Sequence, residues 1–172
     1  AAGGSGSAVA WVGSQETEGT STSTSAANLL VSSTISIVAA TPCQFTFVAG
    51  KSTGHASAAA CGFTVNATVL RAASTSGNKG SWRTGATNLL EFGQGNGILP
   101  TRIGGNYGRV ATGLSHSYGG GTSQDSAGAT SINQDADAPT ATLTSITIPG
   151  IVANASNTIR ADALEIYSYP VA

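Results

Sequence analysis

The residues best suited to chemistry in this 172-residue chain are its two cysteines, its two histidines and a few loop acids. Cys43 and Cys61 each open a segment of alternating apolar residues. If these segments form a hairpin centred near Ser52, the two sulfur atoms lie opposite each other on its inner face, and a disulfide can form. Closing such a loop is worth about 3 kcal/mol in the chain-entropy model. The alternative is a pair of buried thiols that pack as small hydrophobic groups.

Three aspartates give the best indication of a metal site. Asp135 and Asp137 alternate in the sequence NQDADAP, and Asp125 precedes them on the same Gly/Ser-rich connection. Carboxylate oxygens are hard ligands of the kind that calcium takes, although the Gly and the closing Glu of an EF-hand loop are absent. Solvated loop acids are the alternative interpretation. No C-x-x-C or H-x-x-x-H spacing for zinc occurs, so calcium is the only cofactor that the sequence suggests.

The sequence predicts no catalytic residue, and therefore a non-enzymatic protein. His55 and His116 have serine neighbours, but no G-x-S-x-G turn surrounds Ser115 and no aspartate stands in a motif that would orient either ring. The glycines of FGQGNG, residues 92–97, are not followed by the Lys-Ser/Thr pair of a phosphate-binding loop. We interpret both histidines as ordinary surface residues and the glycines as a turn.

Two kinds of residue could connect this chain to carbohydrate. Asn66 and Asn154 stand in Asn-Ala-Thr and Asn-Ala-Ser sequences, the acceptor pattern for N-glycosylation, which matters only if a glycosylating host exports the chain. Aromatic side chains could instead line a platform for a bound glycan, although packing in the core or in an interface is the simpler interpretation. These aromatic residues are Trp11, Trp82, Tyr107, Tyr118, Tyr167 and Tyr169.

The composition argues against several classes of partner. Charged residues make up 9% of the chain, against about 25% in ordinary globular proteins, and the formal net charge is −1. The seven basic residues are scattered, so nothing indicates binding to nucleic acid. No run of about 18 apolar residues indicates a membrane span. A nearly neutral surface lacks long-range repulsion, which favours association with copies of this chain or with another surface.

The elements that must position these residues are predicted to be strands, because apolar residues recur with a period of two and no useful helical period is present. The inward-facing positions expected from this alternation are Val31, Ser33, Ile35, Ile37, Cys43, Phe45, Phe47, Cys61, Phe63, Val65 and Val69. Further strands are expected at residues 8–12, 89–92, 109–118, 140–148 and 159–169. Polar stretches at residues 14–28 and 117–139 are expected to be long connections.

About eight antiparallel strands with Gly-rich connections favour an all-β fold, a two-sheet β-sandwich of the jelly-roll or Greek-key type. Each sheet has one apolar side, which must be buried against the other sheet. Residues 1–7 are expected to be a flexible lead, and residues 8–172 are expected to form a single domain.

Four segments resemble small β-sandwich proteins of tailed-phage virions, which are head-decoration or fibre proteins. These segments are WVGSQETEGTSTSTSAANLL, TPCQFTFVAGK, CGFTVNATVL and ITIPGIVANASNTIRADALEIYSY, and together they cover most of the chain. The resemblance implies a structural role at a virion surface. Its partners would be copies of the chain or a capsid or tail protein, and it supplies no catalytic residue.

The chain is also similar to extracellular fibre subunits that assemble by donating a strand to a neighbour. This similarity implies main-chain pairing between subunits at a cell surface. The candidate donor segment after the flexible lead consists of Ala8, Val9, Ala10, Trp11 and Val12.

A third interpretation is a carbohydrate-binding module, which would make surface glycans the partner.

Overall fold

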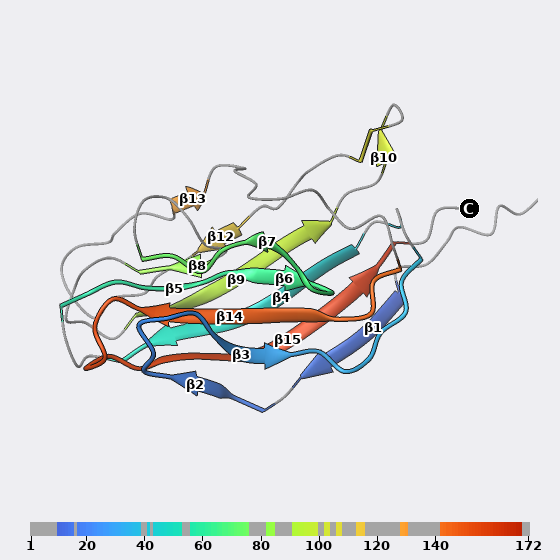
Figure 1. Ribbon diagram of the computed structural model, residues 1–172. Helices are drawn as coiled ribbons and strands as arrows, with labels where there is room; N and C mark the ends of the chain where they lie inside the picture. The colour runs from blue at the N-terminus through green and yellow to red at the C-terminus, as the bar shows by residue number, and fades with distance from the viewer. Residues whose placement is uncertain are drawn as a thin grey trace, which may run out of the picture.

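The computed structural model describes residues 10–15, 17–38, 41, 43–52, 56–75, 82–84, 91–99, 102–103, 106–107, 113–115, 128–130 and 142–169. Every regular element in these ranges is a β-strand (Figure 1), and no helix long and apolar enough to cross a membrane occurs there. The strands are β1 (Ala10–Gln15), β2 (Gly19–Ser21), β3 (Ala27–Val31), β4 (Cys43–Lys51), β5 (Ala59–Cys61), β6 (Phe63–Val65), β7 (Thr68–Arg71), β8 (Trp82–Arg83), β9 (Glu91–Leu99), β10 (Arg102–Ile103), β11 (Asn106–Tyr107), β12 (Gly113–Ser115), β13 (Gly128–Thr130), β14 (Ile146–Val152) and β15 (Ile159–Ser168).

The first sheet has the order β1-β15-β4-β9, and β2 also pairs with β15. β1 and β2 follow each other along one side of β15, because Gln15 lies opposite Leu164 and Gly19 lies opposite Ala161. The other side of β15 pairs with β4, and β4 pairs over its whole length with β9. All these pairs are antiparallel.

The second sheet has the order β7-β6-β14-β5-β8, and β3 pairs with the opposite side of β14. β5 and β6 follow each other along β14 and are separated by Gly62. Figure 1 shows the strands β3, β14 and β6 in front of β15 and β4 of the first sheet. The chain is therefore an all-β, antiparallel two-sheet sandwich, which confirms the predicted fold class.

The core lies between the two sheets. Phe45 in β4 and Phe63 in β6 meet edge to face across it, with ring centroids 4.9 Å apart and an interplanar angle of 62°. Removing such a ring from water is worth about 1.5–3 kcal/mol, so these contacts hold the sheets together. The buried positions that the sequence predicted are Ile35, Ile37, Cys43, Phe45, Phe47, Cys61, Phe63 and Val65.

The prediction that the two cysteine-containing segments form a hairpin is wrong. β4 pairs with β15 and β9, whereas β5 pairs with β14 and β8, so Cys43 and Cys61 belong to different sheets. Alternation identifies the buried face of a strand, but it carries no information about which strand is the neighbour.

Three expected inward positions are exposed. Val31 is 49% exposed because β3 ends there, and beyond it Ser32, not Ser33, is buried. Val69 is 47% exposed because the turn between β6 and β7 places it opposite Thr64, on the outer face. A strand end or a tight turn shifts the alternation by one residue, and the sequence pattern does not show this shift.

Two segments expected to be irregular contain strands. The polar stretch at residues 14–28 contains β2 and the beginning of β3. The glycines within residues 92–97 lie in β9 and form no turn. Glycine is needed at position 95 because the ring of Phe47 packs where a side chain at Gly95 would be. A glycine in a strand marks such a close approach.

Apart from residues 142–145, the described parts of the connection between β9 and β14 are short strands. β10 pairs with β11, and β12 pairs with β13. β12 also contacts β8 and β9, which are the edge strands of the two sheets (Figure 1). It therefore lies where one side of the sandwich closes.

Candidate binding face

The outer face of the first sheet carries a row of aromatic and amide side chains. Directly opposed residues of an antiparallel pair point to the same face. Trp11 in β1, Tyr167 in β15 and Gln44 in β4 are opposed in this way. The hydroxyl of Tyr169 donates to Gln44 Oε1 at 2.8 Å, which brings a third aromatic ring to the same place. We call Trp11, Gln44, Tyr167 and Tyr169 the aromatic row.

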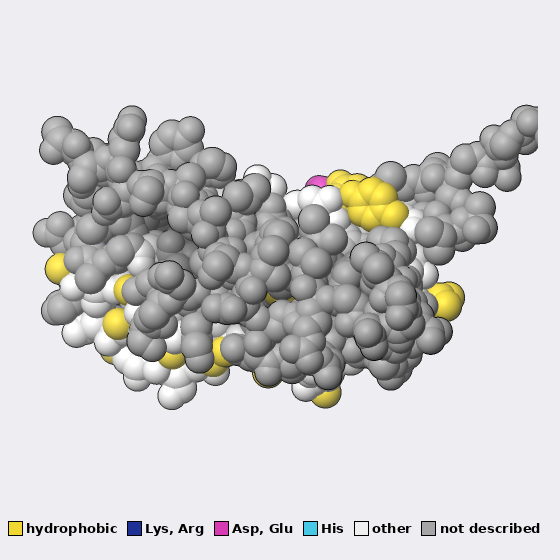
Figure 2. Space-filling view, turned by 90° about the horizontal axis from the view of Figure 1, so that it is seen from above, with side chains coloured by type: hydrophobic (Ala, Val, Ile, Leu, Met, Phe, Trp, Pro, Cys, Tyr) yellow, Lys and Arg dark blue, Asp and Glu magenta, His cyan; other side chains and the backbone are white. Residues whose placement is uncertain are grey.

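The aromatic row is open to solvent. Trp11 is 59% exposed and Tyr169 is 37% exposed. In Figure 2, hydrophobic side chains form an exposed cluster beside an acidic side chain at the upper edge of the view. Exposed hydrophobic residues that are adjacent to each other mark contact or ligand sites more often than scattered ones do.

A carboxylate completes the polar part of this face. Glu165 lies opposite Ser14 on one side and Thr46 on the other. Its Oε2 atom accepts a hydrogen bond from the hydroxyl of Tyr167 at 2.5 Å. This hydrogen bond raises the pKa of Tyr167 above its ordinary value of 10.0, and desolvation and the charge of Glu165 add to the effect. The phenol of Tyr167 therefore remains a donor at neutral pH.

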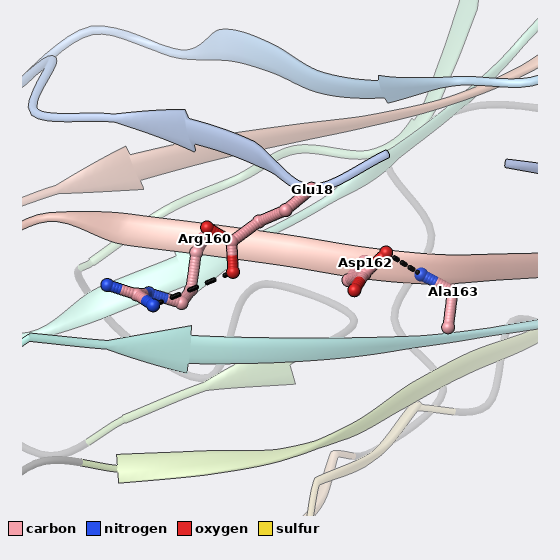
Figure 3. Close-up of polar contacts among 4 residues, drawn as sticks. All are labelled: Glu18, Arg160, Asp162 and Ala163. Atoms are coloured by element: carbon pink, nitrogen blue, oxygen red, sulfur yellow. Dashed lines mark hydrogen bonds and ion pairs between the residues drawn. The ribbon is translucent and has the colours of Figure 1, made fainter. Parts of the chain in front are cut away.

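A shallow hollow of about 220 Å³ lies further along the same face. Gly50 contributes no side chain there, and in the sheet register it stands between Arg160 of β15 and Phe92 of β9. Val48 and Phe92, both about half exposed, add apolar walls. Arg160 Nη1 lies 3.6 Å from Glu18 Oε2 at the rim (Figure 3).

A β-bulge in β15 separates the hollow from the aromatic row. The register between β15 and β4 shifts between Asp162 and Glu165. Within the bulge, Asp162 Oδ1 accepts a hydrogen bond from the backbone N–H of Ala163 at 2.7 Å (Figure 3). Ala163 has a φ of 52°, in the left-handed region that alanine rarely adopts. Bulges of this kind redirect side chains beside functional sites.

These groups can bind a neutral, hydroxyl-rich ligand. Aromatic faces stack against the apolar C–H face of a sugar ring, and the amide of Gln44 and the carboxylate of Glu165 can hydrogen-bond to hydroxyl groups. Among the described residues, no group of three or more His, Cys, Asp and Glu residues could hold a metal ion.

The two cysteines carry thiols and form no disulfide. Cys43 in the first sheet and Cys61 in the second are both fully buried in the core. Burial raises the pKa of the Cys61 thiol far above its ordinary value of 9.0. The structure thus has the alternative arrangement, in which both sulfurs pack as small hydrophobic groups.

The two glycosylation sequences lie in different environments. The Asn66 Nδ2 atom donates to Thr142 O at 3.1 Å, and its Oδ1 atom accepts from Thr144 N at 2.8 Å, so this side chain joins two segments. Asn154 lies in the turn between β14 and β15, where its Oδ1 atom accepts from Ser156 N at 2.8 Å. Asn66 therefore has a clear structural role, whatever its modification.

The remaining expected site residues are only partly described. Ala10, Trp11 and Val12 lie in β1, which completes a sheet of its own chain by pairing with β15. The calcium site stays a prediction. The predicted residues that lie outside the described ranges are Ala8, Val9, His55, His116, Tyr118, Asp125, Asp135 and Asp137.

Sequence reasoning missed the hollow and the grouping of the aromatic row. Trp11 and Tyr167 were noticed as aromatic residues, but they are far apart in the chain, and only the pairing of β1 with β15 brings them together. Arg160 and Glu18 carried no motif. The available signal for Arg160 was its outward position on β15, whose other face is apolar, whereas Glu18 lies just before β2 and gave no such signal.

The chain matches no protein-family model and no curated protein. The class that the fold and the face define is an all-β two-sheet sandwich with an exposed aromatic row on one sheet.

Proposed function

We propose that this chain is a non-enzymatic structural protein of a virion surface, either a capsid decoration protein or a fibre protein. The observation that carries the proposal is the nested order of strand pairs. β1 and β2 pair with the last strand β15, β3 pairs with β14, β4 pairs with β9, and β5 and β6 pair with β8 and β7. We infer that this nesting is a jelly roll, a fold common among viral capsid and lectin domains.

The surface chemistry supports the same proposal. The formal net charge of −1 leaves little repulsion between adjacent copies or against a capsid. Polar uncharged side chains also lose less hydration free energy in a contact than charged ones do. The partners are copies of this chain or a capsid or tail protein. The alternative of a self-assembling extracellular fibre remains distinct, because it requires strand exchange between chains.

Negative-stain electron microscopy of the purified chain at high concentration, with size-exclusion chromatography, tests the proposal against this alternative. We expect dispersed small particles that stay monomeric or form a small closed oligomer until a capsid is supplied. Filaments formed by the chain alone would overturn the decoration function and favour a fibre subunit with β1 as the exchanged strand.

A second candidate function, carbohydrate binding, is favoured by the aromatic row. Binding to a glycan array, followed by titration of the strongest ligand, tests it. We expect Trp11→Ala and Tyr169→Ala to weaken binding at least tenfold. Val31→Ala, which removes an exposed hydrophobic side chain from the second sheet, is the matched control. Array binding that survives both substitutions in the aromatic row would exclude this face as the glycan site.

A further inference from the structure

A lysine and an asparagine meet in the core at one end of the first sheet. Lys51 ends β4, and Asn157 lies in the turn before β15; both are 0% exposed. The Lys51 Nζ atom donates to the carbonyl oxygen of Ser57 at 3.1 Å. The Asn157 Nδ2 atom donates to the same oxygen at 3.2 Å and to Ser57 Oγ at 2.7 Å. The amine and the carboxamide are therefore held beside each other.

The backbone around these two residues is fixed by hydrogen bonds. Ser52 N donates to Thr158 O at 2.8 Å, and Thr158 N donates to Ser52 Oγ at 2.7 Å. Lys51 itself lies opposite Ile159 in the pairing of β4 with β15. Because β4 and the turn before β15 hold the two side chains in a defined relation, folding already supplies the entropic cost of bringing the amine and the carboxamide together.

A lysine in this position has a chemical consequence. A buried ammonium group loses its hydration, which favours the uncharged amine over the charged form. An uncharged, desolvated lysine amine is a nucleophile. An asparagine carboxamide is an electrophile that such an amine can attack when solvent is excluded and the two groups are held close together.

We propose that Lys51 and Asn157 form an intramolecular isopeptide bond. The uncharged Nζ of Lys51 attacks Cγ of Asn157, so that a new N–C bond forms. The bond between Cγ and Nδ2 then breaks, and the Nδ2 group leaves as ammonia after taking one proton that originates on the lysine amine. The products are a secondary amide and one ammonia molecule, and the reaction needs no oxidant, reductant or other co-reactant.

The mass of the intact, denatured wild-type chain tests the proposal. We expect it to be lower than the sequence mass by one ammonia molecule. Protease digestion should then yield one branched peptide that contains both Lys51 and Asn157. A folded chain with the full sequence mass would overturn the proposal. So would a linear peptide that has lost ammonia, because that product is a succinimide at an asparagine.

Matched variants identify the reacting atoms. Lys51→Met and Asn157→Ala should abolish the mass loss, and Asn157→Asp should lose water in place of ammonia. Lys79→Met, which removes the other lysine of the chain, and Asn154→Ala, in the same turn as Asn157, should keep the loss. Since the wild-type mass decides the question, a variant that fails to fold leaves the test intact.

Discussion

The ring of Phe47 in β4 lies directly against Gly95, the residue opposite it in β9. A Cβ atom at Gly95 would clash with three carbon atoms of that ring. Phe47 is only 1% exposed, so the ring has little space into which it could move. A hydrogen atom is therefore the only substituent that this position of β9 accommodates.

We predict that Gly95→Ala lowers the free energy of unfolding by about 1–3 kcal/mol, the usual cost of overpacking a core. Urea denaturation measures the change. Gln94→Ala, an exposed neighbour on the same strand, should change stability little. In the Phe47→Leu background the smaller side chain leaves room, so the cost of Gly95→Ala should fall. Strictly additive losses would contradict the proposed clash.

Asn66 is predicted to matter more for stability than Asn154. Asn66 adopts a φ of 53° and makes hydrogen bonds to Thr142 O and Thr144 N. Asn66→Ala removes both bonds and places alanine in a left-handed conformation, so we expect a loss of about 2–3 kcal/mol. Thermal or urea unfolding measures it. Asn154→Ala removes only a local turn contact and should cost less than half as much; equal losses would refute this assignment.

The buried thiol of Cys61 should make stability depend on pH in the alkaline range. An unfolded thiol titrates near 9.0, whereas burial raises the pKa of folded Cys61 well above this value. The folded state therefore keeps its proton, and stability is full below pH 9 and lost as the pH rises, by up to about 1.4 kcal/mol per unit. Urea unfolding at a series of alkaline pH values measures the slope. Cys61→Ala should make it shallower, and an unchanged slope would show that other groups cause it.

Tyr167 should titrate above an ordinary tyrosine. Its hydroxyl donates to Glu165, and this hydrogen bond raises the pKa of Tyr167 above 10.0. An NMR titration of the tyrosine rings should find one resonance that titrates late and is absent in Tyr167→Phe. Glu165→Gln should lower this pKa, because it removes the charged carboxylate that accepts the hydrogen bond from the Tyr167 hydroxyl. A Tyr167 pKa at or below 10.0 in the wild-type protein would be inconsistent with the hydrogen bond.

Much of the fold could be predicted from the sequence because burial leaves a local signal. In CQFTFVAGK, residues alternate between apolar and polar, and Phe45 and Phe47 are buried as expected. The signal failed where a turn or a strand end changes the face, as at Val31 and Val69. It also failed in β9, whose glycines resemble a turn until the ring of Phe47 is placed against Gly95.

The candidate sites were less predictable, because each consists of residues far apart in the chain. Trp11 and Tyr167 become neighbours only when β1 pairs with β15. Lys51 and Asn157 meet only at the shared carbonyl of Ser57, which belongs to a third segment. Neither grouping has a spacing or a motif that a reading of the sequence could detect.

The sequence by itself determined the all-β class, the charge-poor surface and the inward face of most strands, because these depend on how each residue type partitions between water and an apolar interior. Only the tertiary structure decided that Cys43 and Cys61 lie in different sheets and that Lys51 is enclosed beside Asn157. Strand partners are chosen by the packing of the whole sandwich, since backbone hydrogen bonds are nearly the same for any pair of strands.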